Sequence, residues 1–251
     1  MTIAIAIIWI ILSAPIVLFP LLGVDQKILF DYSLLMQIIT PTAAAVFCCI
    51  TGLVFPKDDA MRKVWMLLGI GMLCWGIGAI LFAAYPLIYE GQETPYPWYS
   101  DIGYLFLVPF VLAAFFVFKK SLHVEVPVWG WVTAAVFFLA ALALSIIFNL
   151  SKFADSNTVL PYTITLLYTI GDPLLLGGTI IIGSILAGGA VGRPWWFVLI
   201  GLILYYTADL IYTYLVVKGQ YATGNFIDIG WLLGFGCIAV AALMTRSLFK
   251  E

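Results

Sequence analysis

Eight long apolar runs constrain this chain more than any other feature of its sequence. Each approaches the ~20 residues that a helix needs to cross a bilayer. Residues 4–12 are apolar on every face, which argues against the alternating pattern of a membrane β-barrel. We therefore predict an all-α integral membrane protein with eight transmembrane helices. The runs cover approximately residues 2–22, 34–55, 64–88, 102–118, 128–149, 161–187, 195–217 and 226–248.

The composition excludes several other classes of protein. Hydrophobic residues make up 64% of the 251 residues and charged residues only 10%. Soluble domains carry about 25% charged residues, so a water-soluble globule is excluded, as is a disordered chain. The net charge of −2 leaves no basic surface for nucleic acid. About 80 residues remain outside the spans, too few for a separate soluble domain.

The loop charges predict the orientation in the membrane. Eight lysines and arginines fall on one side and three on the other. Cytoplasmic loops carry the excess of positive charge in membrane proteins. We therefore expect a multi-pass protein of the plasma membrane, with both termini in the cytoplasm. The majority side holds Lys57, Arg62, Lys63, Lys119, Lys120, Arg193, Arg246 and Lys250, and the minority side holds Lys27, Lys152 and Lys218.

An internal repeat divides the chain. The segment DIGYL at residues 101–105 returns as DIGWL at residues 228–232, a shift of 127 positions. Thr40-Pro41 and Asp172-Pro173 correspond at a shift of 132. We expect two four-helix repeats in one membrane domain, residues 1–126 and 127–251. An even number of spans in each repeat predicts a pseudo-twofold axis along the membrane normal.

Two aspartates fall inside predicted spans, at similar depth in the outer half. A lipid-facing carboxylate costs a few kcal/mol, so Asp172 and Asp209 are expected to face a common cavity that opens outward. Tyr168, Tyr205 and Tyr212 lie three or four residues away on the same helix faces. No lysine or arginine is expected at this depth. The alternative is that the two acids only hold helices together.

Two further aspartates, Asp101 and Asp228, open the fourth and eighth spans, where helix N-capping is the expected role. No catalytic or metal-binding set is found, because His123 is the only histidine and the cysteines lack metal-ligand spacing. The sequence identifies no cofactor. The candidate ligand-binding residues are Asp101, Tyr168, Asp172, Tyr205, Asp209, Tyr212, Asp228 and Trp231.

Three motifs in the predicted outer half of the chain contain aspartate and tyrosine, two of them with glycine as well. They are YSDIGYLFLVP at residues 99–109, ADLIY at residues 208–212 and GQYATGNFIDIGW at residues 219–231. This pattern resembles the multi-span N-terminal sensory region of diguanylate cyclases, phosphodiesterases and some membrane histidine kinases, over nearly the whole chain. In that family a cytoplasmic signalling domain follows the membrane region. This sequence stops at Glu251, so the resemblance implies output through a partner or through a removed domain.

The expected function is therefore a membrane sensor or ligand-binding module rather than an enzyme. The expected partners are the lipid bilayer, a small or lipophilic ligand and a cytoplasmic signalling protein, with a homodimer left open. An ion- or proton-coupled transporter is the alternative, because buried acids suit cation coupling. An intramembrane aspartyl protease is less favoured, since Thr169 breaks the Gly-x-Gly-Asp signature that Gly171 and Asp172 would complete. A structural subunit is the remaining possibility.

Overall fold

The computed structural model describes residues 2–89, 92, 94–155, 158–186 and 192–249. Within these residues the chain is helical, with no strand. Eight segments among the described residues are long and apolar enough to cross a membrane, the same number as the spans that the sequence predicts. The helices are α1 (Thr2–Ser13), α2 (Pro15–Leu21), α3 (Gln26–Gly52), α4 (Ala60–Ile88), α5 (Tyr99–Leu122), α6 (Val128–Asp155), α7 (Val159–Ile185), α8 (Gly192–Val217) and α9 (Asp228–Phe249).

The first span consists of two helices. α1 and α2 together form the apolar segment Thr2–Leu21, divided at Ala14. Pro15 follows directly, and proline has no backbone N–H to continue the hydrogen-bond ladder. The predicted boundary between the repeats, at residues 126 and 127, falls in the connection from α5 to α6.

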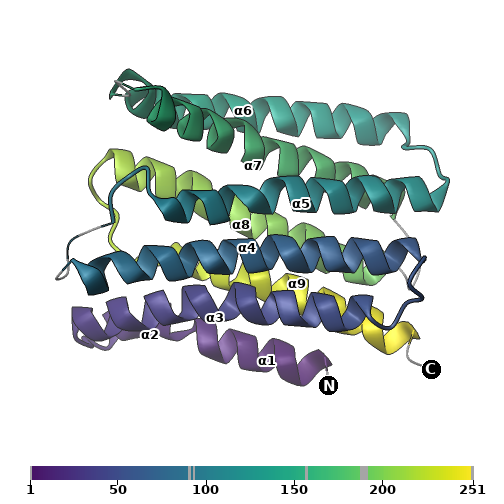
Figure 1. Cartoon of the computed structure of the whole chain (residues 1–251), viewed down its shortest axis with the longest axis horizontal. Coiled ribbons are helices and arrows are strands. Elements are labelled where there is room, and N and C mark those ends of the chain that lie inside the picture. The colour runs from purple at the N-terminus through teal and green to yellow at the C-terminus, as the bar shows by residue number, and fades with distance from the viewer. Residues whose placement is uncertain (1, 90–91, 93, 156–157, 187–191, 250–251) are drawn as a thin grey trace.

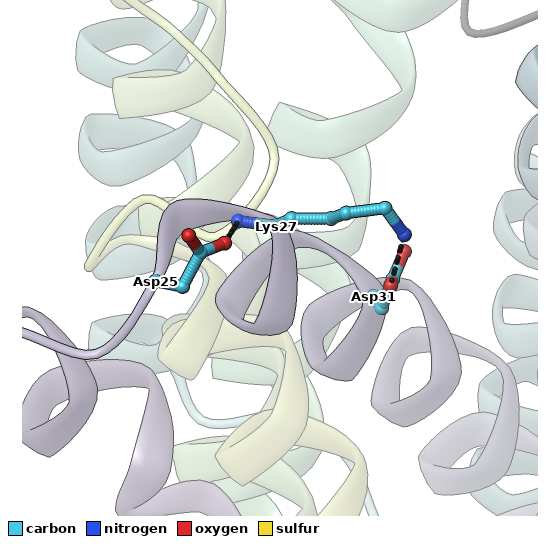
Figure 2. Close-up of polar contacts among 3 residues, drawn as sticks. All are labelled: Asp25, Lys27 and Asp31. Carbon is cyan, nitrogen blue, oxygen red and sulfur yellow. Dashed lines mark hydrogen bonds and ion pairs between the residues drawn. The ribbon is translucent and has the colours of Figure 1, made fainter.

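α3 begins at Gln26, about two turns before the predicted start near residue 34. The Asp25 carboxylate caps it by accepting a hydrogen bond of 2.7 Å from the Lys27 backbone N–H (Figure 2). The Lys27 ammonium then pairs with Asp31 at 3.1 Å, one helical turn further on. Local capping and pairing thus extend the helix into polar sequence that hydropathy alone leaves outside the span.

The helices lie side by side as a bundle (Figure 1). α4 packs between α3 and α5, while α6 packs on α7 and α8 on α9. The two halves of the chain meet where α3 packs against α9 and where α5 packs against α7. α1 begins and α9 ends at one end of the bundle, and the α4–α5 and α8–α9 connections lie at the other (Figure 1).

An aromatic cluster fills the end of the bundle where α1 begins. The Phe118 and Trp195 rings stack at 3.9 Å between centroids, and Trp65 lies 5.9 Å from Trp195. All three side chains are buried. They come from the start of α4, the end of α5 and the start of α8, so these helices are packed closely together at this level.

α4 and α5 approach most closely at two glycines. A Cβ atom added at Gly103 would lie 2.6 Å from the Cys74 carbonyl oxygen and 2.6 Å from the Gly78 backbone. Backbone atoms cannot move aside as a flexible side chain does. Glycine at position 103 is therefore required by this helix contact, in the way that small residues permit close approach of membrane helices.

Substituting Gly103 tests this packing. Gly103→Ala is expected to cost about 1–3 kcal/mol, because it forces α4 and α5 apart. Gly177→Ala is the matched control, since its Cβ would lie no closer than 3.5 Å to any neighbour and alanine is the better helix former. Thermal unfolding of both purified variants in the same detergent measures the difference. Equal melting temperatures for Gly103→Ala and the unsubstituted protein would contradict the close contact.

Candidate functional site

A cavity of about 110 Å³ lies between the two halves, toward the α4–α5 and α8–α9 connections. Every helix from α3 to α9 contributes a side chain to its wall. The two connections contribute as well, through Tyr96 and Tyr221. The cavity is therefore built from both predicted repeats and lies at the end of the bundle opposite the aromatic cluster of Trp65, Phe118 and Trp195.

Seven of the eight candidate residues line this one cavity. The eighth, Asp228, is fully buried beside it and does not reach the wall. The expectation that Asp172 and Asp209 share a cavity with nearby tyrosines thus agrees with the structure. The seven are Asp101, Tyr168, Asp172, Tyr205, Asp209, Tyr212 and Trp231.

The two deep acids differ in how they are held. Asp209 on α8 accepts a hydrogen bond of 2.6 Å from the Trp231 indole N–H on α9. Asp172 on α7 is only 8% exposed. Among the residues that the structure describes, none donates a hydrogen bond to the Asp172 carboxylate. Asp172 therefore keeps unused acceptor capacity on the cavity wall.

Asp101 joins α5 to α7. One carboxylate oxygen accepts the Trp98 backbone N–H at 2.7 Å, and the other accepts the Tyr168 hydroxyl at 2.8 Å. The hydroxyls of Tyr96 and Thr165 form a second α7 contact at 2.9 Å. Burial raises the pKa of Tyr96 to about 12, so its hydroxyl keeps its proton at neutral pH.

Asp228 joins α9 to α3. Its carboxylate accepts hydrogen bonds from the Ser33 hydroxyl at 2.7 Å, the Gln37 amide at 3.2 Å and the Tyr221 hydroxyl at 3.0 Å. The Gly224 backbone N–H donates a fourth, at 2.8 Å. Burial, and then the nearby Asp228, raise the pKa of Tyr221 well above its usual range, so Tyr221 remains a donor.

Asp101 and Asp228 lie just inside their helices rather than at the N-cap position itself. The expected capping role is nevertheless found for Asp101, which is the third helical residue of α5 and forms a capping box with the N-cap residue Trp98. Both lie inside the first turn of their helices, and each accepts a backbone N–H from the chain before the helix, at Trp98 or at Gly224. An N-cap residue would instead accept an N–H from within the helix. The two acids therefore fix the preceding connection against the helix start.

Lys152 also lines the cavity. The sequence predicts Lys152 in a loop and no lysine or arginine at the depth of Asp172 and Asp209. The difference arises because α6 remains helical to Asp155, past the predicted end at residue 149. Its ammonium lies 4.7 Å from the centre of the Tyr96 ring. The cavity wall thus carries three carboxylates, those of Asp101, Asp172 and Asp209, and one ammonium group.

Five aromatic rings that line the cavity follow one another in contact. Trp75 lies 4.8 Å from Tyr104 and 6.3 Å from Trp231, measured between ring centroids. Tyr212 continues the series at 5.5 Å from Trp231 and 4.6 Å from Tyr221. These five residues all line the cavity, and we call them the aromatic wall.

Sequence reasoning missed several lining residues, and some of them carry a detectable signal. Ser145, Asn149 and Lys152 follow the i, i+4, i+7 spacing of one helix face on the apolar helix α6. Gln37 follows Ser33 by one turn in the same way. Trp75 and Tyr104 carry no such signal, because aromatic residues are equally suited to a lipid-facing or a packed position.

Comparisons with protein-family models, with curated proteins and with solved structures give no match to this chain. Among the described residues, no three histidine, cysteine or acidic side chains gather closely enough to hold a metal ion. The cavity between the two halves is therefore the feature of the structure that bears on function.

The Asp228 network provides a test of the site's architecture. Asp228→Asn is expected to destabilise the protein by about 1–3 kcal/mol. The asparagine NH₂ group cannot accept hydrogen bonds, so some of the four donors around residue 228 would lose their acceptor. Asp31→Asn is the matched control, since Asp31 is exposed and its surface ion pair contributes little. Chemical or thermal unfolding in detergent reports both. A silent Asp228→Asn substitution would show that the bonds from Ser33 and Gln37 do not hold α9 to α3 and that those from Tyr221 and Gly224 do not fix the α8–α9 connection.

Proposed function

We propose that this chain is the ligand-binding module of a membrane sensor, and that the cavity between its halves is the binding site. The observation that carries the proposal is the convergence of seven helices on one polar and aromatic cavity. Ligand sites are typically concave, largely apolar and equipped with a few oriented polar groups, and this cavity has that composition.

The proposed setting is the plasma membrane, with both termini in the cytoplasm and the cavity open to the outside. The outward faces of α1 and α6 are apolar, as lipid contact requires. α1 begins and α9 ends at the same end of the bundle (Figure 1). The excess of lysine and arginine in the loops supports the cytoplasmic side for that end.

The proposed architecture is two parallel four-helix repeats. Exchanging the halves relates α3 to α7 and α5 to α9, so the α3–α9 contact corresponds to the α5–α7 contact. The hydrogen bonds follow the same exchange. Asp228 on α9 accepts from Ser33 on α3, and Asp101 on α5 accepts from Tyr168 on α7. These paired contacts support a pseudo-twofold axis between the halves.

α9 is the proposed route from the cavity to the cytoplasmic side. Trp231, near its start, contacts Asp209 and belongs to the aromatic wall. Near its other end, the Arg246 guanidinium donates to the Ile50 carbonyl of α3 at 2.7 Å. A ligand that shifts Trp231 would thereby shift the last turn of α9 against α3. We propose that a cytoplasmic partner or an output domain responds to this movement of α9, as in the sensory regions that the sequence resembles.

An ion- or proton-coupled transporter is the second candidate, favoured by the unbonded Asp172 carboxylate. A carrier must also open its site to the opposite side of the membrane. The stack of Trp65, Phe118 and Trp195 closes that end of the bundle. Opening it would require these buried rings to separate, which favours the binding module over the carrier.

Access to the cavity tests the proposed site. The four native cysteines are first replaced by serine, and Thr213, which lines the cavity, is changed to cysteine. Thr213→Cys is expected to react with a membrane-impermeant trimethylammonium thiosulfonate applied to intact cells. Leu139→Cys, at a position 61% exposed on the apolar face of α6, is the control that lipid should protect. Failure of Thr213→Cys to react above this control would contradict an outward-open cavity.

Ion flux separates the two candidate functions. Purified protein in liposomes that contain a pH-sensitive dye is expected to give no proton flux above empty liposomes after an external acid step. Adding sodium or potassium gradients extends the test to coupled exchange. A flux that Asp172→Asn abolishes would identify a carrier and overturn the sensor proposal.

A further inference from the structure

We propose that the cavity recognises the ammonium group of a small organic cation, with the Asp172 carboxylate as its counter-ion and the aromatic wall around its carbon atoms. This inference rests on the proposed function, because it takes the cavity as the ligand site. It adds the chemical class of the ligand, which the sequence alone left open.

The first support is the balance of charge on the cavity wall. Three carboxylates and one ammonium group line it, so a cation is the ligand whose charge complements it. Asp101 already accepts a hydrogen bond on each oxygen, and Asp209 accepts the Trp231 indole N–H. Asp172 differs, because no described residue donates to it.

The second support is the burial of Asp172. Its side chain is 8% exposed, and its carboxylate lies on the cavity wall. Removing a polar group from water without a compensating partner is unfavourable, and more so for a charged one. A ligand ammonium group would provide both the missing charge and the missing contact.

The third support is the aromatic wall. Cations bind favourably over the faces of tryptophan and tyrosine, and aromatic cages are the usual way in which proteins recognise quaternary ammonium groups. Trp75, Tyr104, Tyr212, Tyr221 and Trp231 bring such rings from α4, α5, α8, α9 and the α8–α9 connection to a single cavity.

The volume limits the size of the enclosed group. About 110 Å³ is somewhat smaller than an apolar cavity of about 150 Å³ that accommodates benzene. A tetrahedral ammonium with a few carbons fits this space, whereas a lipid tail does not. The same group exists on a free amine and on a choline lipid headgroup. Both sources share the recognition chemistry, and the experiment below distinguishes them.

The test compares choline with 3,3-dimethylbutan-1-ol, which has the same shape but a neutral carbon in place of the nitrogen. Binding is measured by calorimetry on the full chain in nanodiscs of phosphatidylglycerol, which has no choline headgroup. Choline is expected to bind at least about tenfold more tightly than the neutral analogue. Asp172→Asn should lose at least about tenfold in choline affinity, whereas Asp172→Glu should retain part of it. Asp31→Asn, which changes an exposed acid outside the cavity, should bind choline normally.

Two further comparisons identify the source of the ammonium group. In phosphatidylcholine nanodiscs, loss of the choline signal would show that the lipid headgroup occupies the site. Retained binding would show that the site prefers a free amine. Glycine betaine tests whether Lys152 accommodates a carboxylate on the same ligand, as a zwitterion would require. Each of these outcomes supports recognition of ammonium.

Equal binding of choline and its neutral analogue would overturn the inference while leaving the cavity as a ligand site. Absence of binding by choline, betaine and the neutral analogue would also overturn it. In that case the labelling of Thr213→Cys shows independently whether the cavity is still accessible as a binding site. If Thr213→Cys still reacts from outside, the site stands and only the ligand class is wrong, whereas an unreactive Thr213→Cys would remove both.

Discussion

The cost of placing carboxylates in an apolar environment determines much of this structure. Four aspartates, Asp101, Asp172, Asp209 and Asp228, lie inside or at the start of helices that are long and apolar enough to cross a membrane. None can face lipid cheaply, since a charged group there costs a few kcal/mol. The helices are consequently arranged so that three acids share a cavity and the fourth is enclosed by donors. The proposed site is thus also the place where the two halves of the chain meet.

The acids of the repeated motif perform a different task from the deeper pair. Asp101 and Asp228 each fix the preceding connection and reach across to a helix of the other half, α7 or α3. Hydrogen bonds that satisfy a buried carboxylate are expensive to remove, so these contacts define the position of α5 and α9. Asp172 is not held in this way. Asp101 and Asp228 have donors for their carboxylate oxygens and hold the helices in place, whereas Asp172 has none among the described residues and is therefore the candidate for binding a ligand.

The sequence was sufficient to predict the helical class, the eight helices long and apolar enough to cross a membrane, and the shared cavity of Asp172 and Asp209, because hydropathy and the cost of buried charge act over whole helices. It failed where local interactions extend a helix. Capping by Asp25 starts α3 early, and the continuation of α6 brings Lys152 to the cavity. The enclosure of Asp228 depends on Ser33 and Gln37, residues nearly two hundred positions away, and no local pattern reveals that contact. The repeat remains a prediction that the paired contacts support, and the orientation and the sensory role remain predictions.

A density map of the protein purified in its native lipids would reveal whether the cavity between the two halves holds a bound molecule. We expect the helices α3 to α9 to enclose the cavity, as in the present structure. We also expect density that the chain does not explain inside it, next to Asp172 and the aromatic wall. A collapsed cavity, or a map in which Asp172 or Asp209 faces lipid, would contradict the account.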